Sequence, residues 1–130
     1  KAFESSGTPI DNLTFEAGDL TILNDREWGG SDDDAGSHKS LLLCVHGCKS
    51  LTHESIELAE LKQWAWLCVP CCLHLENHLD DKTSLKVSDE TRFTMLCGAI
   101  AAKYKPDTVA SIDSRVTARG IVLASSGLGD

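Results

Sequence analysis

The sequence contains no hydrophobic run long enough to cross a bilayer. Its longest apolar stretches, 41–45 and 64–72, have the length of strands, whereas a transmembrane helix needs about 20 mostly apolar residues. The N-terminus also lacks the pattern of a signal peptide. We therefore expect a protein without a membrane span, located inside the cell in the cytoplasm or an organelle.

Positive charge is scarce as well. The chain has 12 Lys and Arg residues against 20 Asp and Glu residues, which gives a net charge of -8. An acidic surface repels phosphate groups. A broad nucleic-acid-binding surface is therefore not expected from this chain alone.

Two ligand-binding loops are missing from the sequence. No G-x-G-x-x-G motif occurs, although glycine is needed where a backbone must approach a bound cofactor closely. The segment 24–40 contains three consecutive aspartates but not the Gly and Glu spacing of a calcium loop. We interpret 24–40 as a mobile acidic loop.

The remaining sequence alternates between predicted strands and helices. The run 41–45 is apolar at every position, which is typical of a central parallel strand covered on both faces. Other predicted strands are 13–17, 64–69 and 120–124, and Pro70 ends the second of these.

Two helices are expected between these strands. Thr52 is the predicted cap of the first, which runs to about Gln63, and Ser88 caps the second, which ends before Pro106. Five apolar residues recur at helical spacing and define the buried face of the second helix: Phe93, Leu96, Cys97, Ile100 and Tyr104.

This order predicts an α/β fold with a mostly parallel sheet and flanking helices, a partial Rossmann-like arrangement in a single domain over residues 1–130. Ligands bind such sheets beyond the carboxyl ends of the strands. The residues that follow the predicted strands are therefore the candidate site residues. They are Asp19, His46, Cys48, Cys71, Cys72 and His74.

The six cysteines lie in predicted strands, in a helix and at strand ends. Disulfide-rich domains are loop-rich, so a reducing compartment is the better interpretation. Cys44, Cys68 and Cys97 are expected in the core, since free cysteine packs as a small hydrophobe. Cys48 or Cys71 beside a histidine is also a conceivable nucleophile pair.

Two zinc sets remain open, although zinc is the less favoured interpretation of these residues. The first set has zinc-like spacing, but two of its members lie inside predicted strands, where a tetrahedral site does not form readily. The second lies at the strand ends and is geometrically easier. The sets are Cys44, Cys48, Cys68 and Cys71, or else His46, Cys48, Cys71 and His74.

Two segments carry a family resemblance. LLLCVHGC at 41–48 and WAWLCVPCCLH at 64–74 resemble the strand ends of class I S-adenosylmethionine-dependent methyltransferases, in the branch that includes tRNA ribose methyltransferases. The segments 15–20 and 117–123 add weaker similarity. The family's Gly after the first Cys is replaced here by Lys49.

The resemblance implies a methyltransferase-like domain related to RNA modification, with S-adenosylmethionine as its cofactor. His46 or His74 would act as the base, and Asp19 would contact the cofactor. Cys48 together with Cys71 and Cys72 would line the acceptor side. RNA enters only through this resemblance.

The family's cofactor-binding half has no counterpart in the 130 residues. The sequence also begins at Lys1 and not at Met, so we expect a missing N-terminal segment or another protein chain to complete the domain, which would be inactive by itself. The alternative is a non-catalytic accessory subunit of a larger protein assembly, for example an organellar one.

Overall fold

The computed structural model describes residues 13–14, 16–24, 40–77, 79, 84 and 86–127. In chain order its elements are the 3-10 helix η2 (Leu20–Leu23), β1 (Leu41–Gly47), α1 (Leu51–Leu61), β2 (Ala65–Pro70), the 3-10 helix η3 (Leu75–Asn77), α2 (Asp89–Tyr104), β3 (Thr108–Ser111) and β4 (Ile121–Ser125). Among these helices, none combines the length and the apolar character that a bilayer span requires.

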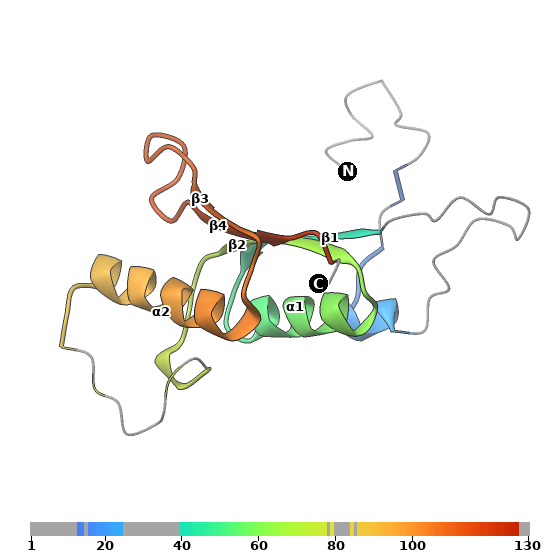
Figure 1. Ribbon diagram of the computed structural model, residues 1–130, viewed down its shortest axis with the longest axis horizontal. Coiled ribbons are helices and arrows are strands. Elements are labelled where there is room, and N and C mark those ends of the chain that lie inside the picture. Colours follow the sequence, from blue (N-terminus) through green and yellow to red (C-terminus); the bar gives the residue numbers. More distant parts are fainter. Residues whose placement is uncertain are drawn as a thin grey trace, which may run out of the picture.

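The four strands form one open, mixed sheet in the order β1-β2-β4-β3. β1 and β2 are parallel neighbours, and β4 runs antiparallel to both β2 and β3. Both helices lie on the same face of this sheet (Figure 1). The α/β class is confirmed, but the sheet is not fully parallel, because β4 returns in a hairpin from β3.

Helix α2 follows the sequence prediction closely. The Ser88 side chain accepts a hydrogen bond from the Thr91 backbone N–H, which satisfies a donor that the first turn leaves open. The predicted face is the buried one: Phe93, Leu96, Cys97, Ile100 and Tyr104. The helix ends where Lys105 adopts a left-handed conformation with φ of 47°.

Helix α1 begins differently from the prediction. Ser50 occupies the cap position without a side-chain hydrogen bond, so Thr52 is not the cap. Instead the Thr52 hydroxyl is buried and donates to the Gly47 carbonyl oxygen at 2.8 Å. This bond ties the first turn of α1 to the end of β1.

Other predictions need correction. The described residues of 13–17 form no strand; the chain folds into η2 directly afterwards, with Asp19 as its cap. The short strand β3 was not predicted, because its side chains are exposed and give no burial pattern. Most of the predicted acidic loop 24–40 lies outside the described residues.

β1 is an edge strand and not a central one. Leu42 and Cys44 face α1, while Leu41, Leu43 and Val45 on the opposite face are 62%, 60% and 56% exposed. Among the described residues β1 pairs only with β2, so no described strand lies along its other edge. The prediction that this apolar run is covered on both faces is therefore wrong for the described residues.

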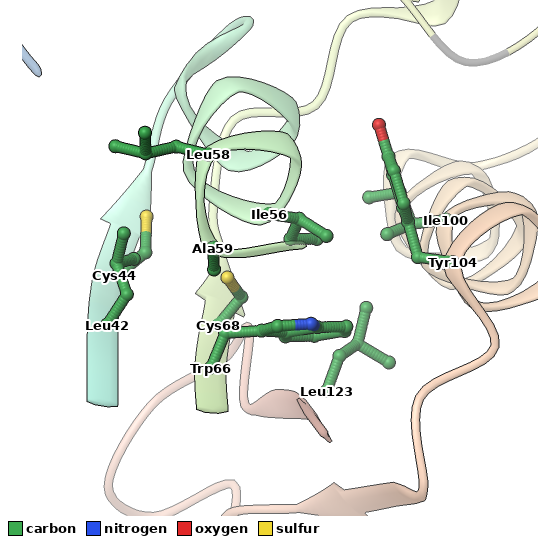
Figure 2. Close-up of a cluster of buried hydrophobic side chains, with 10 residues drawn as sticks. All are labelled: Leu42, Cys44, Ile56, Leu58, Ala59, Trp66, Cys68, Ile100, Tyr104 and Leu123. Carbon is green, nitrogen blue, oxygen red and sulfur yellow. The ribbon is translucent and has the colours of Figure 1, made fainter. Parts of the chain in front are cut away.

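The core lies between the sheet and the two helices. Figure 2 shows Trp66 from β2 at its centre, with Leu123 from β4 beside it and Ile56 and Ile100 above it. Cys44 and Cys68 are register neighbours on β1 and β2, and both are buried beneath α1. Cys97 is also buried, so the three cysteines predicted in the core are confirmed there.

A hydrogen-bonded network joins α1 to α2. Tyr104 Oη donates to Glu57 Oε1 at 2.8 Å and lies 2.6 Å from His53 Nδ1. Lys103 Nζ donates to the same Glu57 oxygen at 3.0 Å. The bonds from Lys103 and then Tyr104 lower the pKa of Glu57 below its usual value of 4.5.

Tyr104→Phe should cost about 1 kcal/mol at neutral pH, because it removes a partly screened hydrogen bond to a carboxylate. A carboxyl group with a lowered folded pKa contributes stability above its unfolded pKa and loses that contribution as the pH falls through the folded value. The difference between wild type and variant should therefore shrink in acid. Urea unfolding at neutral and acidic pH measures it, and a pH-independent difference would contradict the assignment.

Candidate functional site

Three cysteine thiols meet at the carboxyl ends of the two parallel strands. Cys48 follows β1, and Cys71 and Cys72 follow β2. Their sulfur atoms all lie within 4.8 Å of one another, and the Cys71 and Cys72 sulfurs are 3.6 Å apart. The structure thus brings three of the candidate site residues together, since the ends of parallel neighbours meet at one edge of a sheet.

The turn after β1 places Cys48 toward the end of β2. The register of β1 and β2 shifts between Val45 and Gly47, and His46 has a positive φ of 58°. Lys49 also has a positive φ, 56°, and its N–H donates to the Cys72 carbonyl oxygen at 2.9 Å. Positive φ is costly for residues other than glycine, so this turn is held by its surroundings.

A second support comes from the segment between β3 and β4. Arg119 Nη1 donates to the Cys71 carbonyl oxygen at 2.7 Å, and the guanidinium lies 5.2 Å from the centre of the Phe93 ring. Arg119 thus joins the cysteine segment to α2. This role of Arg119 could not be predicted from the sequence, because no local pattern links Arg119 to a segment 48 residues away.

The neighbouring thiols oppose the ionisation of Cys71. Partial burial raises the pKa of Cys71, and the neighbouring Cys72 and Cys48 sulfurs raise it further. Adjacent thiolates repel because like charges at this distance disfavour the ionised form. A bound cation would remove that repulsion, since metal ligation requires the deprotonated thiol.

The structure changes the expectation about zinc. Of the four cysteines with zinc-like spacing, Cys44 and Cys68 lie in the core beneath α1 (Figure 2). The hydrogen bond with Cys44 and burial raise the pKa of the Cys68 thiol, which favours the neutral form. Cys72 instead completes a group of three with Cys48 and Cys71, and this group has the geometry to hold a metal ion. That does not support the expectation that zinc is disfavoured.

The two candidate histidines do not join the thiols among the described residues. The possible metal-binding group contains only cysteines. His46 lies in the irregular end of β1, with its side chain exposed. His74 is exposed too, and its Nδ1 lies 3.2 Å from Glu76 Oε1. The second zinc set is therefore not assembled as expected.

Asp19 lies in a different place, along the outer side of α1. Its carboxylate accepts from the Thr21 N–H at 2.9 Å, and this bond lowers its pKa. With Glu54 and Glu57 it lines an open groove of about 300 Å³. Three carboxylates repel anions, so this groove favours a neutral or cationic occupant.

Comparisons of the chain with family models, with curated proteins and with solved structures found no match.

Proposed function

We propose that this chain is the C-terminal half of a class I methyltransferase-like domain and that a cofactor-binding half completes it. The observation that carries the proposal is the strand order β1-β2-β4-β3, in which only β4 is reversed. In this order the two strands that carry the resemblance, β1 and β2, are parallel neighbours, so their carboxyl ends bring Cys48 beside Cys71 and Cys72. The absence of a glycine-rich loop is consistent with a C-terminal half that does not bind the cofactor without the other half.

The uncovered side of β1 supports the proposal. A parallel strand is normally paired on both edges and covered on both faces. Here no described strand pairs with the outer edge of β1, and its exposed face carries Leu41, Leu43 and Val45. A second half that adds a strand beside β1 and a helix over these side chains would bury all three.

The proposed roles follow the positions at the strand ends. S-adenosylmethionine would supply the methyl group when bound. His46 or His74 would accept a proton from the acceptor, and Cys48, Cys71 and Cys72 would line the acceptor side. Asp19 remains the candidate contact to the cofactor. RNA as acceptor rests on the resemblance, and with a net charge of -8 on this chain, the phosphate contacts would come from the other half.

Calorimetric titration of S-adenosylmethionine into the full-length gene product tests the proposal. Heat of binding is expected for that product and not for the 130-residue chain alone. Absence of heat for the chain, the full product and the chain with its partner would remove the methyltransferase proposal.

Leu43→Lys should have different effects in the isolated chain, where this face of β1 is exposed, and in the completed protein, where it would be buried. In the isolated chain the unfolding free energy should change by less than about 0.5 kcal/mol, because exposed side chains contribute little. In the completed protein the same change should weaken S-adenosylmethionine binding by roughly tenfold or more, since a lysine would be buried at the junction.

Val109→Lys is the matched control. Val109 is 61% exposed, much like Leu43 at 60%, but it lies on β3 at the opposite edge of the sheet. Calorimetry and urea unfolding of both variants give the comparison. Equal effects of the two lysines on cofactor binding would argue against a junction at β1.

A non-catalytic accessory subunit is the second candidate, and the same apolar face of β1 favours it. In that case a partner chain would cover Leu41, Leu43 and Val45 without forming a cofactor site. Such a subunit should co-elute with its partner and give no heat with S-adenosylmethionine. Elution of the full-length product as a stable, cofactor-free monomer would count against this candidate.

A further inference from the structure

We propose that Cys48, Cys71 and Cys72 form a binding site for a thiophilic divalent cation, zinc being the representative ion, with one coordination position open to an external ligand. The site goes beyond the proposed methyl transfer and does not depend on it. No disulfide joins these cysteines, and each offers one sulfur ligand.

The distances between the sulfur atoms fit one metal ion. Zinc binds cysteine sulfur at about 2.3 Å in tetrahedral geometry, so two sulfurs on the same zinc lie about 3.8 Å apart. The Cys71 and Cys72 sulfurs are 3.6 Å apart, and the group as a whole is within 4.8 Å. The ion therefore requires the third sulfur to move by no more than about 1 Å, within the reach of side-chain rotation.

The carbonyl oxygen of each of the three cysteines accepts a hydrogen bond from another segment or from the next turn of the chain. Lys49 N–H binds the Cys72 carbonyl oxygen, and Arg119 binds the Cys71 carbonyl oxygen. The Cys48 carbonyl oxygen accepts from the Leu51 N–H at 3.0 Å, at the start of α1. These bonds leave the sulfur atoms as the groups that are free to close on an ion.

The ligand set selects the class of metal. Thiolates favour zinc and other soft ions, whereas magnesium and calcium require oxygen ligands. The group that the structure brings together contains no carboxylate. No described residue adds a fourth ligand to the group, and Cys48 and Cys72 are exposed, so water or a donor from a bound molecule can reach the ion.

Cobalt(II) titration of the reduced full-length protein tests the site. The protein is stripped with a chelator, kept without oxygen and titrated with Co²⁺ in the absence of S-adenosylmethionine. An equimolar complex should show thiolate-to-cobalt absorption, and Zn²⁺ should abolish it. Lack of this absorption in protein whose thiols are all reduced would overturn the proposal.

Single substitutions assign the ligands. Loss of any one thiol should weaken Co²⁺ binding by roughly 100-fold, because even the loss of a group that only orients a metal ligand costs up to about that much. The variants are Cys48→Ser, Cys71→Ser and Cys72→Ser. Cys97→Ala is the control, because Cys97 is buried in α2 and is not part of the group. The metal affinity of this variant should stay within about twofold of wild type. If Cys97→Ala weakened binding as much as Cys71→Ser, the assignment would be wrong.

Thermal unfolding provides a second measurement. An ion that binds only the folded chain raises the unfolding midpoint. Zn²⁺ should raise the midpoint of wild type and of Cys97→Ala, but not that of Cys71→Ser. Equal shifts in all three would place the ion elsewhere. A protein that binds cobalt but not S-adenosylmethionine would support this site and remove the methyltransferase proposal, so the two fail separately.

Discussion

Trp66→Ala should destabilise the protein by about 3–5 kcal/mol, the usual cost of removing a large aromatic side chain from a core. Trp66 is 1% exposed and lies on β2, between β1 and β4 in the sheet. Its indole fills the space between the sheet and the helices (Figure 2). A small domain has a total stability of about 5–15 kcal/mol, so this one change removes a large share of it.

Urea unfolding followed by circular dichroism measures the loss. Leu61→Ala, at a side chain of α1 that is 77% exposed, should change the unfolding free energy by less than about 0.5 kcal/mol. If Trp66→Ala is unfolded in water, Trp66→Phe supplies a folded variant, whose unfolding free energy should lie between those of the wild type and Trp66→Ala. A loss below about 1 kcal/mol for Trp66→Ala would contradict a central position for β2.

Gly47→Ala should cost about 2–4 kcal/mol, because it combines overpacking with the loss of a buried hydrogen bond. A Cβ atom at Gly47 would lie 2.6 Å from Thr52 Oγ1 and 2.7 Å from Cys44 Sγ. The Thr52 hydroxyl would have to leave the Gly47 carbonyl, and the start of α1 would shift. Because this turn positions Cys48, the variant should also weaken Co²⁺ binding.

Gly98→Ala is the matched control for Gly47→Ala. Gly98 is exposed in α2, and a Cβ added there meets no atom within 4 Å. Replacing a helical glycine with alanine stabilises by about 0.5–1 kcal/mol, because the unfolded chain loses freedom. Urea unfolding should thus give opposite signs for the two variants. Similar effects would show that the turn at Gly47 is not as crowded as the distances indicate.

The two proposals can be tested separately, because one depends on the exposed side of β1 and the other on the three thiols. Leu43→Lys changes the exposed apolar face without touching a cysteine, and Cys71→Ser removes a thiol without altering that face. The effects of these two variants on S-adenosylmethionine and on Co²⁺ therefore report on different functions. If the two sites are energetically independent, the losses of binding free energy in the double variant should equal the sum of those in the two single variants.

Features that depend on short-range physics could be predicted from the amino-acid sequence. Helix α2 has its cap at Ser88 and its buried face where the spacing placed them, because a cap bond and a helical period each involve residues only three or four positions apart. The parallel pairing of 41–45 with 64–69 agrees with the strand–helix–strand order of the sequence, because a helix between two strands favours a parallel crossover. That pairing brought Cys48 near Cys71 and Cys72.

The neighbours of each strand, in contrast, depend on contacts between segments that are distant in the sequence. An all-apolar run indicates burial, but it does not say which segment supplies the cover, and β1 is covered by α1 on one face alone. The reversed direction of β4 depends on the hairpin with β3, whose exposed residues carry no burial pattern. The choice of Cys72 over Cys44 and Cys68 as the third thiol depends on which side of the sheet each sulfur faces, and contacts between distant segments fix that.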